Sequence, residues 1–237
     1  MGSFAATGDM LFGGRVRSAL LSDGRFFFAE DGNVAEIYDQ ASGTFALTAS
    51  YTSSSPVLVD TATLLPDGKV LVTGCAAKCS AGTTEVYDPH TYTFSSTGSR
   101  RAWYAISTAT LLTNGTVLFV EGNDNALPDD AEIYDPASGV FTHIGFTSSV
   151  HAFSAAARLF DGTVLIAGGQ LAGGDGNNSA ELYVPATSTF HSAGTMTAGR
   201  HSHTATSLPD RTVLLVGGYG NWPAPTSTAE IYKPNAK

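Results

Sequence analysis

Short runs of apolar and β-branched residues alternate with turn signals along the chain. A run from Ile106 to Leu112 is followed by the turn signal Asn114-Gly115 and by a second run, Thr116 to Val120, which together predict a β-hairpin. Two more runs, Ala131 to Tyr134 and Val140 to Thr142, follow across a polar segment and a turn. We therefore expect a unit of four short antiparallel strands, named a to d in chain order.

The same unit recurs five times. The triplet Glu-aliphatic-Tyr, which lies on strand c, marks the copies at steps of 49, 47, 49 and 49 residues by subtraction. A fixed period of this length indicates one supersecondary unit copied around an array. A carboxylate at the same place in every copy is interpreted as a hydrogen-bonding or solvated strand position rather than as a catalytic group. The copies are Glu36-Ile37-Tyr38, Glu85-Val86-Tyr87, Glu132-Ile133-Tyr134, Glu181-Leu182-Tyr183 and Glu230-Ile231-Tyr232.

The turn between strands a and b also recurs, with one exception. Four copies are Asp-Gly or Asn-Gly, the usual sequence of a type I′ turn, in which both central residues have positive φ. The fifth copy is Asp210-Arg211. Because arginine tolerates positive φ poorly, we expect this turn to be strained or of another type.

Three features of the repeat resemble the kelch family. A glycine doublet closes strand b as Gly168-Gly169 and Gly217-Gly218, a Tyr-Asp-Pro-like turn follows strand c, and an aromatic residue lies on strand d. The resemblance covers essentially the whole chain, although the tryptophan usual on strand d is replaced by Phe45, Phe94, Phe141 and Phe190. It implies an all-β, five-bladed kelch-like β-propeller with four-stranded antiparallel blades, in a single domain over residues 1–237. The blades are expected at about residues 15–48, 58–97, 105–144, 152–193 and 201–237.

The fifth repeat ends after strand c, without a strand d of its own. A matching strand occurs at the other end of the chain, where Gly2 to Gly8 reads like the outer strand Tyr92 to Gly98. If residues 2–8 complete the blade formed by residues 201–237, no sheet edge stays unpaired. We therefore expect the N-terminal strand to close the propeller.

Composition restricts the classes of binding partner, but it does not indicate a reaction. The net charge of -9 and the pI near 4.9 disfavour nucleic acid and anionic lipid, and no apolar run is long enough to span a membrane. Cys75 and Cys79 leave two possibilities open. A local disulfide would fit a secreted or periplasmic protein, whereas two reduced thiols would fit a cytosolic one.

Candidate binding residues come from the loops, which carry the positions that do not repeat. In a propeller the d–a and b–c loops lie on one face, and a symmetric scaffold must depart from symmetry there to recognise an asymmetric ligand. Counting back from each a–b turn predicts that six polar side chains border the mouth of a central channel, with two tryptophans as outer contacts. The six are Asp60, Tyr104, His151, Arg200, His201 and His203, and the tryptophans are Trp103 and Trp222.

Aromatic residues of the same loops, among them Tyr51, Phe153 and Tyr219, are interleaved with amide and carboxylate residues such as Asp175 and Asn221. Flat aromatic faces beside such groups suit carbohydrate or peptide recognition, although turns also require Asn and Asp. We therefore expect a module that binds a protein, a peptide or a carbohydrate through this face.

Two alternatives stay open. His151, His201 and His203 could hold a transition metal as neutral imidazoles, but no close Cys/His spacing supports a built cage, so the residues predict no cofactor. Galactose oxidase shares the kelch propeller, and this resemblance implies, as the enzyme alternative, a copper-dependent oxidase with Tyr104, His151, His201 and Cys75 near the metal. The other alternative is a scaffold, natural or engineered, without a ligand.

Overall fold

The computed structural model describes residues 2–53, 57–76, 82–101, 106–122, 128–221 and 223–234. The fold is all-β, since every regular element within these residues is a strand. No helix of the described residues could cross a membrane. The chain divides into two compact parts, which we name the N-terminal unit (Met1–Trp103) and the C-terminal unit (Tyr104–Lys237).

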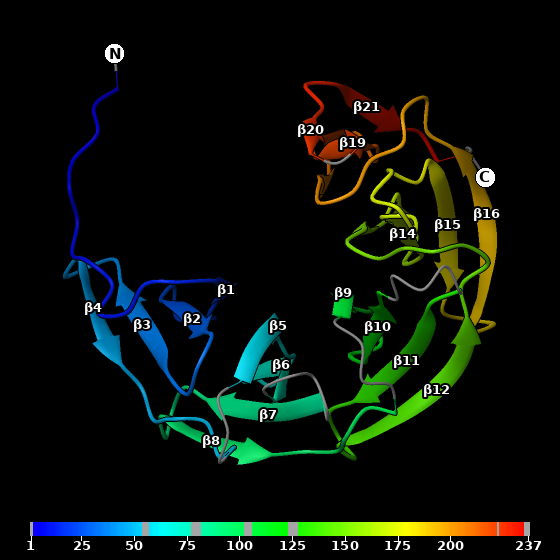
Figure 1. Cartoon of the computed structure of the whole chain (residues 1–237). Coiled ribbons are helices and arrows are strands. Elements are labelled where there is room, and N and C mark those ends of the chain that lie inside the picture. Colours follow the sequence, from blue (N-terminus) through cyan, green and yellow to red (C-terminus); the bar gives the residue numbers. More distant parts are fainter. Residues whose placement is uncertain are drawn as a thin grey trace. The chain divides into compact units, whose positions relative to one another are not determined.

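The N-terminal unit contains two antiparallel sheets of four strands each, hydrogen-bonded in chain order (Figure 1). This is the order that consecutive hairpins produce. The first sheet consists of β1 (Val16–Leu20), β2 (Phe26–Glu30), β3 (Ala35–Asp39) and β4 (Thr44–Leu47), and the second of β5 (Val57–Leu64), β6 (Val70–Ala76), β7 (Gly82–Asp88) and β8 (Thr93–Ser96).

The C-terminal unit contains two further four-stranded sheets and a smaller fifth sheet (Figure 1). The third sheet consists of β9 (Ile106–Leu111), β10 (Val117–Glu121), β11 (Asp130–Asp135) and β12 (Val140–Phe146), and the fourth of β13 (Ala155–Arg158), β14 (Val164–Ala167), β15 (Ser179–Val184) and β16 (Thr189–Thr195). The fifth has the order β17 (Thr204–Ser207), β18 (Val213–Val216) and β21 (Ala229–Tyr232). A short hairpin of β19 (Tyr219–Asn221) and β20 (Ala224–Pro225) connects β18 to β21.

The register of the four-stranded sheets places the tyrosine of strand c directly opposite the phenylalanine of strand d. The ring centroids are 4.8 Å apart in the first and third sheets, 4.9 Å in the second and 5.2 Å in the fourth. Such a pair contributes about 0.5–1.5 kcal/mol beyond the area it buries. The pairs are Tyr38 with Phe45, Tyr87 with Phe94, Tyr134 with Phe141 and Tyr183 with Phe190.

Strand b supplies the centre of the core, as its apolar sequence predicts. The predicted core residues of strand b are buried, apart from the half-buried Leu214, because strand b has neighbouring strands on both sides and packed residues on both faces. Within the N-terminal unit, Phe27 stacks on Tyr87 at 4.7 Å and joins the first sheet to the second. The predicted core residues are Val70, Leu71, Val72, Val117, Leu118, Phe119, Val164, Leu165, Val213, Leu214 and Leu215.

The a–b turns differ from the predicted type I′. Only the last residue of each turn has positive φ, between 85° and 88° at the four glycines and 72° at Arg211. In the fifth turn Leu208 N donates to Thr212 O and Arg211 N donates to Leu208 O, which is a three-residue loop ending in a left-handed residue. The aspartate helps to fix this loop, because Asp210 Oδ1 accepts from Thr212 N at 3.0 Å. Arg211 therefore has the positive φ that arginine tolerates poorly, in the same loop type as the other four turns.

Replacing Arg211 by Gly is expected to raise the free energy of unfolding by about 1 kcal/mol, because a left-handed conformation costs a non-glycine residue energy of that order. The Arg211 guanidinium lies 5.8 Å from the ring centroid of Phe160, and its loss reduces the gain. Arg211→Ala is the matched control, since it loses this contact and keeps the strain. In urea denaturation the glycine variant should be more stable than the alanine variant, and equal stabilities would contradict the strain.

The segment of residues 2–8 forms no strand in the structure. Its last residue is held by the first sheet, where Gly8 N donates to Gly43 O at 2.8 Å and Thr7 Oγ1 lies 2.7 Å from the hydroxyl of Tyr38. Within the described residues the fifth sheet has three strands. The expected completion of this sheet by residues 2–8 therefore stays a prediction.

Candidate functional site

The repeated glutamate of strand c holds the chain where it enters the same sheet. Glu85 accepts hydrogen bonds from the backbone N–H groups of Thr52 (2.7 Å) and Ser53 (3.0 Å), which precede β5. A buried N–H group left unpaired costs about 1–3 kcal/mol, so the carboxylate stabilises this irregular segment. The hydrogen-bonding interpretation is confirmed at four glutamates. The others are Glu36 with Leu11 and Phe12, Glu181 with Ser148, and Glu230 with Thr197 and Ala198.

His151 lies on the connection before β13, with its side chain buried against the fourth sheet rather than on a surface. Its side chain is fully buried, with Nε2 at 2.9 Å from Glu181 Oε2 and Nδ1 at 2.6 Å from the carbonyl oxygen of Gly168. Both partners are acceptors, so both contacts are hydrogen bonds only when each ring nitrogen carries a proton. Burial raises the pKa of Glu181, but hydrogen bonds from His151 and Ser148 outweigh it and hold the pKa below the usual value.

Arg200 occupies the corresponding place in the fifth sheet, 49 positions after His151 by subtraction, as Glu230 is 49 after Glu181. The side chain is fully buried, and its Nη2 donates to Glu230 Oε1 at 2.8 Å. Nη1 donates to the carbonyl oxygens of Gly217 and Thr228, both at 3.0 Å. His151 and Arg200 thus occupy equivalent positions in the fourth and fifth sheets, and each contacts the strand c glutamate of its own sheet.

Asp60 lies in the N-terminal unit and is also buried. Arg100 Nη2 is 3.9 Å from Asp60 Oδ2 and donates to the carbonyl oxygen of Gly74 at 3.2 Å. Arg17 Nε donates to the backbone oxygen of Asp60 at 2.7 Å. Arg100, which the sequence reasoning did not single out, is therefore the ion-pair partner of a predicted site residue.

A carboxyl pair in the first sheet was also missed. Glu30, the last residue of β2, is 2% exposed and stands where the fourth and fifth sheets have Gly168 and Gly217. Burial, followed by the charge of Glu36 and a hydrogen bond with it, raises the pKa of Glu30 to about 7. The hydroxyl of Tyr51 lies 3.1 Å from Glu30 N and 3.2 Å from Glu30 O, so Tyr51 is buried here rather than displayed on a loop. The sequence feature that indicates this pair is Glu30 itself, which stands where the fourth and fifth repeats have glycine.

His201 and His203 are close in sequence but lie in different surroundings. The His201 ring stacks on Tyr219 with a centroid distance of 5.6 Å and an interplanar angle of 24°, and burial lowers the pKa of His201. His203 is buried, and neither of its ring nitrogens has a hydrogen-bond partner among the described residues. Burial and, next, the charge of Arg200 lower the pKa of His203 to about 4, so this imidazole is neutral at pH 7.

Most of the remaining predicted residues lie outside the part of the chain that the structure describes. Trp103, Tyr104 and Trp222 lie outside the described residues. Cys75 is disulfide-bonded, and Cys79 lies outside the described residues. Within the part of the chain that the structure describes, no three His, Cys, Asp or Glu side chains form a group that could hold a metal ion.

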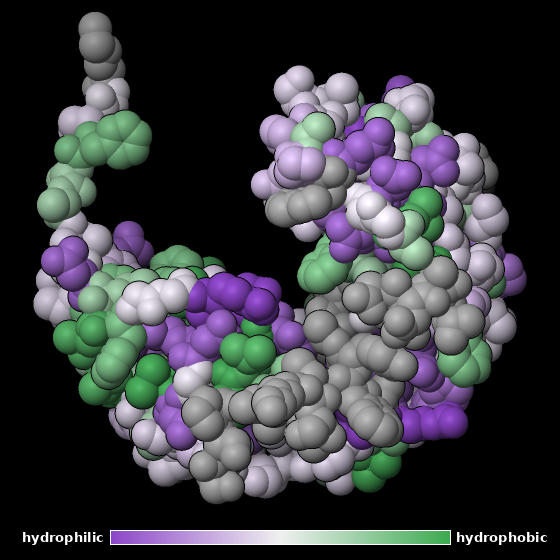
Figure 2. All heavy atoms as spheres, in the orientation of Figure 1, coloured by the Kyte–Doolittle hydropathy of each residue, from purple (hydrophilic) through white to green (hydrophobic). Residues whose placement is uncertain are grey.

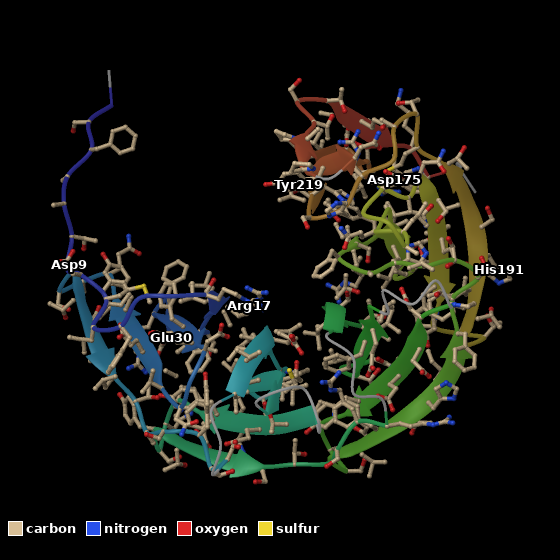
Figure 3. The ribbon with its side chains drawn as sticks, viewed as in Figure 1. Asp9, Arg17, Glu30, Asp175, His191 and Tyr219 are labelled. Carbon is tan, nitrogen blue, oxygen red and sulfur yellow. The ribbon has the colours of Figure 1, made fainter. Side chains whose placement is uncertain are left out.

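Five loop residues of the C-terminal unit form the surface that we call the loop surface, defined as Phe153, Asp175, His201, Tyr219 and Asn221. Phe153 and His201 lie on d–a connections, with ring centroids 6.5 Å apart, and the other three lie on b–c connections. Asp175, Asn221 and Phe153 are exposed, Tyr219 is half-buried and His201 is buried beneath them. Asp175 and Tyr219 are labelled in Figure 3, in the C-terminal unit.

Backbone hydrogen bonds between neighbouring loops fix the loop surface. His201 N donates to Tyr219 O at 3.0 Å, and Tyr219 N donates to His201 O at 2.9 Å. Ser202 N donates to Phe153 O at 2.8 Å, and Asp175 forms a β-bridge with Asn221. Residues from four separate connections are therefore held in one arrangement by hydrogen bonds within the chain.

Phe153 carries two unfavourable features at once. Its φ is 56°, a left-handed conformation that costs a non-glycine residue about 1–3 kcal/mol, and its side chain is 52% exposed. Tyr92 is also large with positive φ, at 59°, but its hydroxyl accepts a hydrogen bond from Arg25 Nη1 at 3.0 Å. Among the described residues, the ring of Phe153 has one aromatic neighbour, His201. Such strain is typical of functional positions.

Comparison with known proteins shows the fold and not the family. No family model and no curated protein matches the chain, so the kelch relationship remains a resemblance. Among solved structures the chain is similar to a novel fungal alcohol oxidase with catalytic diversity among the AA5 family, in complex with copper, with a TM-score of 0.72 and 17% identity. The match covers 92% of this chain and 51% of the other, so the chain spans about half of that protein's length. The five sheets and this likeness show that the fold is a five-bladed, all-β propeller.

Proposed function

We propose that this protein is a binding module that recognises carbohydrate through the loop surface of the C-terminal unit. The observation that carries the proposal is the row of rings from Phe153 through His201 to Tyr219, held by hydrogen bonds between neighbouring loops. Aromatic faces pack against the C–H face of a sugar ring, while amide and carboxylate groups beside them bond to its hydroxyl groups. Asn221 and Asp175 supply such groups.

Charge favours a neutral ligand over an anionic one. The exposed rim carries the carboxylate of Asp175, and the nearest arginine of the d–a connections, Arg200, is fully buried and paired with Glu230. The chain as a whole carries a net charge of -9. Hydroxyl groups of a neutral glycan can bond to a carboxylate, whereas phosphate or carboxylate groups of a ligand would be repelled.

The strain at Phe153 supports a functional surface rather than an ordinary loop. Glycine at this position would remove the left-handed strain, and a polar residue would remove the exposed ring, so stability alone favours neither feature of Phe153. We expect the left-handed conformation and the exposed ring of Phe153 to be retained together where the ring contacts a ligand.

Copper chemistry like that of the similar oxidase is not supported by the donors among the described residues. Both ring nitrogens of His151 are bonded to Glu181 and Gly168, and Cys75 is disulfide-bonded, so neither is available as the resemblance to galactose oxidase implied. His201 is stacked on Tyr219 without a second histidine donor joining it in a metal-binding group of the described residues. We therefore derive no step through copper.

Replacing Phe153 by Gly is expected to abolish or weaken glycan binding at least tenfold, about 1.4 kcal/mol or more, without lowering the melting temperature. A glycan array probed with the wild type and the variant tests this expectation. Phe160→Ala is the matched control, because Phe160 is also exposed, at 63%, but lies beside an a–b turn of the same unit. It should bind like the wild type.

Two results would contradict the proposal. One is a wild-type protein that binds no glycan above background on a broad array. The other is a Phe153→Gly variant with unchanged glycan binding. A peptide library screened in parallel would identify the competing ligand class, and selective peptide binding lost in Phe153→Gly would replace carbohydrate by peptide.

A further inference from the structure

Two carboxyl groups lie next to each other inside the first sheet. Glu36 of β3 is opposite Phe28 of β2, and Glu30 is two positions after Phe28, so both carboxyl side chains are on one face of the sheet. Glu36 is 0% exposed and Glu30 is 2% exposed, and Figure 3 labels Glu30. Among the described residues, no lysine, arginine or histidine forms an ion pair with either carboxyl group.

The fourth and fifth sheets show what is missing from this place. In the fourth sheet the strand c glutamate, Glu181, contacts His151, which comes from the d–a connection. In the fifth sheet Glu230 contacts Arg200 from the corresponding connection. The residue at the same distance before the a–b turn of the first repeat is Gly13, which has no side chain. The first sheet therefore has a second carboxyl group where two of its counterparts have a nitrogen donor.

The carboxyl pair holds one proton, and its contacts place that proton on Glu30. Two ionised carboxylates side by side in a buried place repel each other, so one of them stays protonated. Glu36 Oε1 accepts from Leu11 N at 2.9 Å and from Phe12 N at 3.0 Å, and these contacts favour its ionised form. Protonated Glu30 is then the donor to Glu36. In agreement, burial, followed by the charge of Glu36, raises the pKa of Glu30 to about 7.

The other titratable groups around Glu30 do not replace this proton. The hydroxyl of Tyr51, from the connection before β5, lies 3.1 Å from Glu30 N, and burial raises the pKa of Tyr51 above its usual value. Asp31, the next residue, pairs with Arg15 at 3.8 Å. Arg17 of β1 donates to a backbone oxygen of β5 at 2.7 Å. The charge of the carboxyl pair is therefore set by the proton on Glu30.

Glu36 holds a segment that has few other attachments. Residues 9–14 form no strand, and their two large apolar side chains at positions 11 and 12 are 57% and 47% exposed. Backbone hydrogen bonds attach the chain to the first sheet before the segment, at Gly8, and after it, at Arg15. Between these points, within the described residues, the backbone is bonded to the sheet through Glu36. Figure 2 shows apolar surface on the N-terminal stretch that leads to the first sheet, whose course can be followed in Figure 1.

We propose that Glu30 and Glu36 form a pH-sensitive latch, which fixes residues 9–14 to the first sheet while Glu30 is protonated and releases them when Glu30 ionises. Loss of the proton removes the donor to Glu36 and leaves two negative charges beside each other. Glu30 lies against Tyr51, which is packed in the core of the N-terminal unit, whereas Glu36 reaches water once the segment lifts away. The latch lies within the N-terminal unit and is independent of the proposed glycan binding.

Amide exchange measured by NMR on the full chain between pH 5 and 9 tests the proposal. After correction for the intrinsic increase with pH, exchange of the Leu11 and Phe12 amides should speed at least tenfold, with a midpoint near pH 7. The second sheet has glycine at the place of the second carboxyl group. The amides of Thr52 and Ser53, which Glu85 holds there, are therefore the internal control and should keep their corrected exchange rate.

Two variants separate the latch from a general effect of pH. Glu30→Gln keeps a donor toward Glu36 and cannot ionise, so the amides of residues 11 and 12 should stay protected up to pH 9. Asp31→Asn removes the neighbouring carboxylate, which pairs with Arg15, and should leave the transition in place. The proposal is overturned if the wild type shows no transition, because Glu30 would then turn to water without releasing the segment. It is also overturned if Glu30→Gln retains the transition.

Discussion

Replacing His151 by Leu is expected to lower the free energy of unfolding by about 3 kcal/mol at pH 7. Leucine fills a similar volume, so the loss comes from polar groups that lose their partner rather than from a cavity. The Glu181 carboxylate, 2% exposed, loses its 2.9 Å contact with Nε2, and the Gly168 carbonyl loses its 2.6 Å contact with Nδ1. Urea denaturation followed by circular dichroism measures the change.

His203→Leu is the matched control in the same unit. His203 is also buried, but its ring nitrogens have no hydrogen-bond partner among the described residues, so an apolar side chain leaves no group newly unpaired. Its free energy of unfolding should stay within about 1 kcal/mol of the wild type or exceed it. A loss at His203 as large as that at His151, or no loss at His151, would show that the hydrogen bonds of His151 do not have the structural role assigned to them.

Replacing Glu30 by Gln is expected to stabilise the protein at pH 8 by up to about 3 kcal/mol and to have little effect at pH 4. Burial raises the pKa of Glu30 to about 7 in the folded protein, above the ordinary value of 4.5. Between these two values the folded state binds the additional proton, so the free energy of unfolding falls as the pH rises from about 4.5 to 7. Glutamine cannot ionise, so Glu30→Gln removes this decrease in the free energy of unfolding.

The pH dependence is measured as the difference between Glu30→Gln and the wild type in urea denaturation at pH 4, 6 and 8. His203, with its pKa near 4, has the opposite effect, since its stability contribution is lost as the pH falls from about 6.5 to 4. That contribution is common to both proteins and cancels. Glu85→Gln serves as the control, because it weakens the acceptor for Thr52 N and Ser53 N in the second sheet and should destabilise at every pH. A difference between Glu30→Gln and wild type that does not grow with pH would contradict the assignment.

The fold could be predicted because its signal is repeated. Each Glu-aliphatic-Tyr triplet fixes the same strand, and the five copies remove the ambiguity that any single short strand carries. The turn type was predicted wrongly because Asp-Gly fits two loop geometries. The hydrogen bonds from Leu208 N to Thr212 O and from Arg211 N to Leu208 O select the longer loop.

The interior roles of His151 and Arg200 could not be predicted for a different reason. A position that varies between repeats suggests a binding site, but here the variation reflects different ways of filling one space. In the fourth and fifth sheets strand b is followed by Gly168 and Gly217, and a side chain from the d–a connection bonds to the carbonyl oxygen of each. In the first sheet Glu30 stands at the position of that glycine, and its own side chain fills the space. The hydrogen-bond partners of His151 are 17 and 30 positions away in the sequence, so no local motif predicts them.

The loop surface was predicted only as a set of residue types. Phe153 and Tyr219 were recognisable as loop aromatics, but the positive φ of Phe153 was not, because neither glycine nor asparagine occurs between His151 and Ser154. The β-bridge from His201 to Tyr219 joins two connections of the fifth repeat, and the β-bridge from Asp175 to Asn221 joins connections of the fourth and fifth repeats. No sequence pattern specifies either bridge. These contacts between loops give the surface its fixed shape.

Titration calorimetry with the glycan that binds best on the array tests the central claim most directly. The wild type and Phe160→Ala should bind this glycan with the same dissociation constant, and Phe153→Gly should bind at least tenfold more weakly while melting at the same temperature or higher. Equal affinity of the wild type and Phe153→Gly would contradict the claim that the loop surface is the binding site.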